Sequence, residues 1–144
     1  MNKQTDTTAL IGRIFLAVLF FLSGVGKLAA PAATQAYIAA MGLPAPSLAY
    51  LGSTAIELIG SVLLIVGFRV RTVAVGMAVY TLLTAVFFHR NLADQNQMIH
   101  FFKNIAIMGG LLQVAAFGAG RYALDHLSGR KDAPSDAAHL AAAE

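Results

Sequence analysis

Residues 47–68 form an apolar run of about twenty residues with a single charged side chain, Glu57, and the run is long enough to cross a bilayer as a helix. At ~1.5 Å per residue, Glu57 falls near the centre of a hydrocarbon layer ~30 Å thick. A carboxylate at that depth is costly unless it faces the interior of a bundle and has a partner. Any fold of this chain must therefore place Glu57 against a group that compensates its charge.

The composition assigns the chain to the integral membrane proteins. Hydrophobic residues make up 58% of its 144 residues and charged residues 12%, and the mean hydropathy is +0.69. An ordinary soluble domain carries roughly a quarter charged residues. The sequence has no cysteine, which excludes disulfides, thiolate catalysis and cysteine-ligated iron–sulfur clusters. Its basic residues are scattered rather than clustered, so we expect no nucleic-acid partner.

Four apolar stretches predict an all-α fold, a bundle of four transmembrane helices. They cover residues 8–28, 47–68, 70–88 and 98–117. Between the first two, residues 31–41 are too short to span and begin with proline, which predicts a short interfacial helix anchored by Tyr37. We expect Ser47 to cap the second span. Arg13 and Lys27, near the two ends of the first span, are expected to extend to opposite interfaces.

The chain is expected to hold one membrane domain, residues 1–125, followed by a disordered cytoplasmic tail, residues 126–144. The tail is polar and alanine-rich, and it has too few bulky apolar residues to build a core. Seven lysines and arginines lie at the chain ends and in the turn between the second and third spans, against three on the opposite side. Because lysine and arginine are enriched in cytoplasmic segments, this count predicts that both termini are cytoplasmic.

Polar side chains gather on one face of the second span, with Glu57 at its middle. Tyr50, Ser53, Thr54 and Ser61 are three, four or seven residues away from Glu57, so they share its helical face. We expect this face to point into the bundle, because lipid offers it no hydrogen-bond partners.

Basic side chains on the other spans are candidate partners for Glu57. Lys103 lies about five residues, or ~7 Å, into the fourth span, and its side chain extends further, so we rank it first as the ion-pair partner. Lys27 is nearer the surface and ranks second. His89 and His100 are expected near the mouth of the site, which would open toward the periplasmic side.

The simpler interpretation of these polar groups is that they fasten the helices together. Interhelical hydrogen bonds in membranes contribute about 0.6 kcal/mol each, which suits a structural role for Ser23 and Asn104. The pair of Glu57 with Lys103 favours function, since apolar packing could replace a buried ion pair at little cost. His89 and His100 lie eleven residues apart with no third ligand nearby in the sequence, so we expect no metal site.

In their order along the chain, six motifs resemble those of the DoxX family of small bacterial membrane proteins. They are SGxxK at residues 23–27, GLP at 42–44, IELIG at 56–60, GFRVR at 67–71, FFH at 87–89 and HFFKNIAIMGG at 100–110. The resemblance covers residues 11–125 and implies a four-helix bundle in the bacterial inner membrane. It also implies a candidate oxidoreductase subunit, since the family includes subunits linked to thiosulfate-to-quinone electron transfer and to membrane-associated redox complexes. The matching positions are Ser23, Lys27, Glu57, His89, His100, Lys103 and Asn104.

Two functional hypotheses follow. In the first, the chain is a redox subunit, relevant to redox stress, whose pocket holds a quinone. Lys103 or His100 would bond a quinone carbonyl, and Glu57 would exchange its protons. The remaining residues would line the ligand: Lys27, Ser23, His89 and Asn104. A redox partner protein would then supply electrons, and a homo-oligomer is compatible with the sequence. In the second, the chain is a non-enzymatic accessory subunit or small-solute carrier, and the buried pair serves assembly or passage.

Overall fold

A computed structural model describes residues 3–127, and the regular structure in this range is helical. The six helices are α1 Lys3–Ala29, α2 Pro31–Ala40, α3 Pro46–Val66, α4 Val70–Phe88, α5 Gln95–Phe117 and α6 Leu124–Leu127. Four of them, α1, α3, α4 and α5, are long and apolar enough to cross a membrane. The predicted all-α fold with four spans and a short intervening helix is confirmed. The boundary expected after Asp125 falls inside α6, and most of the expected tail lies outside the described residues.

The start of α3 differs from the expected cap. Pro46 occupies the first turn, and Ala45 precedes it in the left-handed conformation with φ 51° and no side-chain cap. Ser47 instead donates its hydroxyl hydrogen to Oε1 of Gln35 on α2, at 2.7 Å. Because Pro46 has no N–H group, one of the unpaired donors at the helix start is already absent. The Ser47 hydroxyl forms a hydrogen bond between α3 and α2 instead.

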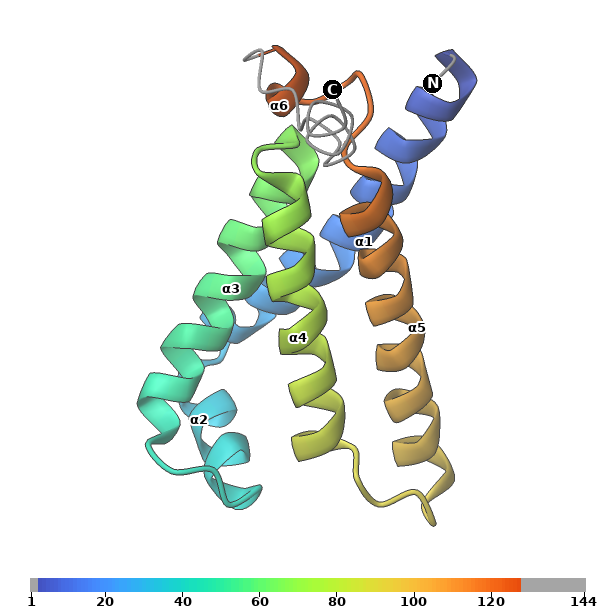
Figure 1. The fold of residues 1–144 in the computed structure, drawn as a ribbon. Helices are drawn as coiled ribbons and strands as arrows, with labels where there is room; N and C mark the ends of the chain where they lie inside the picture. The colour runs from blue at the N-terminus through green and yellow to red at the C-terminus, as the bar shows by residue number, and fades with distance from the viewer. Residues whose placement is uncertain (1–2, 128–144) are drawn as a thin grey trace, which may run out of the picture.

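The start of α1 and the end of α6 lie at one end of the bundle, and α2 and the α4–α5 connection lie at the other (Figure 1). We call these the terminal end and the α2 end. Helix α1 packs chiefly on α3, and α4 packs chiefly on α5. Helix α2 folds back onto α3. The bundle is therefore two helix pairs, joined by the turn between α3 and α4.

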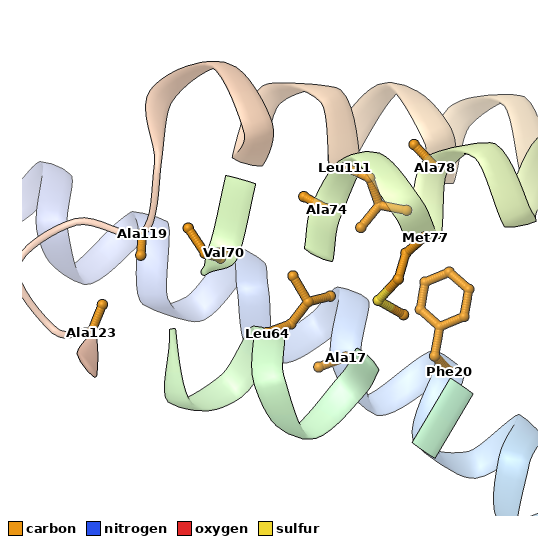
Figure 2. Close-up of a cluster of buried hydrophobic side chains, with 10 residues drawn as sticks. All are labelled: Ala17, Phe20, Leu64, Val70, Ala74, Met77, Ala78, Leu111, Ala119 and Ala123. Atoms are coloured by element: carbon orange, nitrogen blue, oxygen red, sulfur yellow. The ribbon is translucent and has the colours of Figure 1, made fainter. Parts of the chain in front are cut away.

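The apolar core lies in the middle and toward the terminal end. Small and medium side chains from all four spanning helices and from the segment after α5 form it (Figure 2). Its members are Ala17, Phe20, Leu64, Val70, Ala74, Met77, Ala78, Leu111, Ala119 and Ala123. The alanines allow the helices to approach closely, as is usual in membrane bundles. The apolar core therefore occupies this half of the bundle, and the polar residues around Glu57 lie between it and the α2 end.

Arg13 does not extend to the interface as expected but is fully buried, with 0% of its surface exposed. It donates hydrogen bonds to the carbonyl oxygens of Leu64 at 2.9 Å, Ile65 at 3.4 Å and Tyr122 at 2.6 Å. Leu64 and Ile65 belong to the last turn of α3, whose carbonyls have no partners within the helix. The guanidinium carries enough donors to serve several carbonyls at once, which explains why it turns inward.

Two aspartates complete the terminal end by accepting hydrogen bonds from backbone N–H groups. Asp125 accepts from the N–H of Arg69 at 2.7 Å and of Val70 at 2.9 Å, at the start of α4. Asp6 accepts from the N–H of Arg121 at 3.0 Å. A carboxylate at a helix start also meets the positive end of the helix dipole. The segment after α5 is thereby fixed to α1 and α4.

We expect both ends of the chain to be cytoplasmic, on the seven-to-three asymmetry of lysine and arginine. Reporter fusions measure this directly. A fusion at the C-terminus should report the cytoplasm, and one in the α4–α5 connection near Asp94 should report the periplasm. A periplasmic C-terminus would contradict the expected orientation.

Candidate functional site

Glu57 lies inside the bundle, on the face of α3 that carries the other polar residues. Its exposed fraction is 4%, and Tyr50, Thr54 and Ser61 on the same face are also buried. Ser53 is half-buried, and its hydroxyl donates to the carbonyl of Tyr50 at 3.0 Å. The helical spacing thus brings one polar stripe against α1 and α4.

Lys27 is the basic partner of Glu57. Its Nζ lies 2.7 Å from Oε1 and 2.6 Å from Oε2 of Glu57, and 2.9 Å from Oγ of Ser23 one turn earlier on α1. An ammonium group has three hydrogens to donate, and these contacts account for all of them. Lys27 and Glu57 therefore form a short, charge-assisted pair in which the lysine has no donor left for a ligand.

The ranking of Lys103 ahead of Lys27 is wrong, and the arrangement of the helices explains the error. Gly24 packs directly on Glu57 and Leu58, since a Cβ at Gly24 would come within 3.3 Å of the Glu57 Cβ. The last turn of α1 therefore lies beside the middle of α3 rather than beside its start. Lys103 Nζ instead lies 2.8 Å from Nδ1 of His100, one turn earlier on α5.

Tyr80 is a member of the site that sequence reasoning missed. Its hydroxyl donates to Oε1 of Glu57 at 2.7 Å, so the carboxylate receives hydrogen bonds from both α1 and α4. Thr84, one turn later, donates to the Tyr80 carbonyl at 2.9 Å. The available signal was the four-residue spacing of Tyr80 and Thr84, which places both hydroxyl groups on one face of α4.

His89 and His100 meet although they lie on different helices. Their rings stack with centroids 5.0 Å apart, and Nδ1 of His89 lies 2.9 Å from Oε1 of Gln97. Because Oε1 can only accept, His89 carries its proton on Nδ1 in this arrangement and leaves the lone pair on Nε2. In residues 3–127, no group of three or more side chains that could hold a metal ion is present.

A cavity of about 440 Å³ lies between α3 and α4 at the α2 end, and we call it the apolar cavity. Aromatic and aliphatic side chains supply most of its wall, including Tyr37, Phe87 and Phe88. The rings of Tyr37 and Phe88 stack there with centroids 5.6 Å apart. Its polar groups are Ser23, Lys27, Thr34, Ser53, Glu57, Tyr80, Thr84 and His89.

A second cavity of about 330 Å³ reaches α5, and we call it the α5 cavity. Lys103, Asn104 and Ile107 of α5 face Leu19 and Phe20 of α1 across it. It shares five lining residues with the apolar cavity: Ser23, Glu57, Tyr80, Thr84 and His89. The structure thus brings six of the seven predicted site residues to these cavities, and His100 adjoins them through Lys103.

Comparison with known proteins agrees with this architecture. A family model described as DoxX matches residues 8–90, which include Lys27, Glu57, Tyr80 and His89 and end before α5. No solved structure matches the chain.

Three curated proteins are similar in sequence. Inner membrane protein YqjF of Escherichia coli (strain K12) is 39% identical over 131 residues, which are 91% of this chain and 99% of the relative. Inner membrane protein YphA of the same organism is 36% identical over 121 residues, 81% of this chain and 86% of the relative. A Bacillus subtilis (strain 168) protein named "Putative oxidoreductase CatD" is 36% identical over 86 residues, 60% of this chain and 62% of the relative.

Proposed function

This chain belongs to the DoxX family and is a multi-pass inner-membrane protein, and from that premise we propose that it is a redox subunit that holds a lipophilic quinone in the apolar cavity beside Glu57. The name of the CatD relative supports an oxidoreductase role. In the proposal, electrons come from a redox partner protein, and this chain supplies the binding site and the protons.

One observation carries the proposal: a buried carboxylate, held by Lys27 and Tyr80, forms part of the wall of an apolar cavity. Holding helices together does not require a charge in that position, because well-packed apolar residues often serve as well or better. An ionisable group inside a membrane domain is more often part of a ligand or proton pathway.

The lining of the apolar cavity supports a quinone as the ligand. Its walls near Tyr37, Phe87 and Phe88 suit a flat ring and an apolar tail, and its polar wall includes the Ser23 hydroxyl, which can donate to a ring oxygen. A volume of about 440 Å³ lies within the range of ligand pockets. A bound quinone would supply two-electron chemistry, which this cysteine-free chain lacks.

Different side chains are proposed to hold the carboxylate, to bind the ligand and to exchange protons. Lys27 holds Glu57 in place and, with its donors occupied, leaves the ligand to other groups. The Ser23 hydroxyl accepts from Lys27, so its own hydrogen can be donated to a ring oxygen. Glu57 is the group proposed to exchange protons with the ligand, and Tyr80, which donates its hydroxyl hydrogen to Oε1, links the carboxylate to the cavity wall. His89 lines both cavities and provides a second group that can exchange protons with water.

The alternative function is a non-enzymatic accessory subunit, and the contacts of Glu57 with two other helices support it. The pair of Lys27 with Glu57, extended by Tyr80, ties α1, α3 and α4 together, as a purely structural network would. The structure gives less support to a solute carrier, because both cavities lie toward the α2 end. The core and Arg13 fill the terminal end, so neither cavity continues through it.

Glu57→Gln separates the two functions, because glutamine keeps the shape and much of the hydrogen bonding but cannot titrate. We expect the variant to fold and to lower quinone reduction by membranes containing the redox complex by about 10²- to 10⁴-fold, the usual contribution of a general acid or base. The absorbance spectrum and extracted lipids of the purified native protein should also reveal bound quinone.

The matched control is Asp94→Asn, which removes a carboxylate at the α2 end outside both cavities and keeps a good helix cap. It should retain full activity. Full activity in a folded Glu57→Gln variant would rule out proton exchange by Glu57 and favour the accessory role.

A further inference from the structure

The cavities hold one more positive than negative side chain. Residues 3–127 contain four carboxylates, Asp6, Glu57, Asp94 and Asp125, and Glu57 is the one that lines the cavities. Asp6 and Asp125 bind backbone N–H groups at the terminal end, and Asp94 accepts from the N–H of Gln97 at the start of α5. Lys27 balances Glu57, which leaves the charge of Lys103 without an opposite charge among these groups.

The contact that Lys103 makes does not neutralise it. For the ammonium to donate to Nδ1 of His100 at 2.8 Å, that nitrogen must carry a lone pair, so the imidazole is neutral. His89, stacked on His100, directs its Nδ1 proton toward Gln97. Lys103 follows the start of α5 by eight residues, or ~12 Å of helix, and its side chain is exposed at the surface of the bundle while lining the α5 cavity. A cation on a spanning helix gains from a counter-anion.

The surroundings of Lys103 resemble those of a binding site for an amphiphile. Asn104, next to Lys103 on α5, also lines the cavity and carries an amide that can donate a hydrogen bond to an oxygen, and Leu19, Phe20 and Ile107 provide an apolar wall. The α5 cavity, at about 330 Å³, is large enough for a two-ring compound.

We propose that the α5 cavity is a binding site for an organic monoanion, with the oxyanion on Lys103 Nζ and Asn104 and the apolar body against Phe20 and Ile107. This site shares five lining residues with the apolar cavity, but its charged anchor, Lys103, and its neighbour Asn104 line the α5 cavity alone. The ligand class is a carboxylate or enolate attached to an aromatic or aliphatic group.

A matched pair of probes tests the charge requirement in the full-length protein, purified in a nonionic detergent. We expect 2-naphthoate to bind at least about tenfold more tightly than the neutral 2-naphthamide, because a hydrogen bond between charged groups is stronger than its neutral counterpart. Lys103→Gln should abolish this preference, and Lys103→Arg should keep it. Lys3→Gln removes the same charge at the terminal end and should leave both affinities unchanged.

Equal affinity of the native protein for the two probes would overturn the proposal. So would a preference for 2-naphthoate that persists in Lys103→Gln, because the charge would then act from elsewhere. Both outcomes are affinities for naphthyl probes, whereas the Glu57→Gln test measures quinone reduction. A failure of the anion site is therefore distinguishable from a failure of the quinone proposal.

Discussion

Replacing Lys27 alone with methionine should lower the free energy of unfolding by about 3–5 kcal/mol, the usual effect of leaving one member of a buried ion pair without its partner. Glu57, with 4% of its surface exposed, would keep one hydrogen bond, from Tyr80, and lose the charge that balances it. Unfolding in mixed detergent micelles, followed by far-ultraviolet circular dichroism, measures the change.

Two comparisons make this result specific. The double variant Lys27→Met, Glu57→Leu should recover much of the lost stability, since no buried charge remains. Lys103→Met should cost less than about 1 kcal/mol, because Lys103 is exposed and contacts a neutral ring. Equal losses for Lys27→Met and Lys103→Met would contradict the assignment of the ion pair.

Replacing Arg13 with methionine should lower the free energy of unfolding by about 3 kcal/mol or more, since each buried carbonyl that loses its partner costs about 1–3 kcal/mol. The carbonyls of Leu64 and Tyr122, at 2.9 and 2.6 Å from the guanidinium, account for most of the effect. The same micelle titration measures it.

Arg121→Met is the matched control, because the Arg121 side chain is 57% exposed and its contact with Asp6 is long, at 3.9 Å. Its cost should stay below about 1 kcal/mol. If Arg13→Met proved as mild as Arg121→Met, the guanidinium would have to reach water rather than the end of α3.

The spans were predictable because the bilayer constrains them so strongly. A run of about twenty apolar residues has few alternatives to a transmembrane helix, and the proline at residue 31 marked α2 equally well. The direction of the polar face of α3 followed from helical periodicity alone. These features depend on spacing along one helix, which the sequence contains directly.

Partners across helices were not predictable in the same way. Counting residues placed Lys27 too near the surface, because the count assumed that α1 and α3 begin and end at the same depth. The chain between Ala29 and Pro46 forms α2 and a loop, which allows α3 to start beyond the end of α1. Arg13 was misplaced for a related reason, since its partners are carbonyls that become available only where α3 ends. Tyr80 was not predicted, because the spacing within α4 gives the face that carries its hydroxyl group but not the helix that this face meets.

The hydrogen bonds at the terminal end can form only late in the synthesis of the chain. Arg13 and Tyr122 are 109 residues apart, and Asp6 and Arg121 are 115 apart, so these bonds join the earliest and the latest parts of the described chain. Ribosomes make the first span long before the residues that bind it, and closing such long loops costs more chain entropy than closing the α3–α4 turn. During insertion, the Arg13 guanidinium therefore enters the bundle before the Tyr122 carbonyl, its acceptor at 2.6 Å, has been synthesised. Arg121 and Tyr122, which are made after the last of the four spans, hold the first helix in place through Asp6 and Arg13.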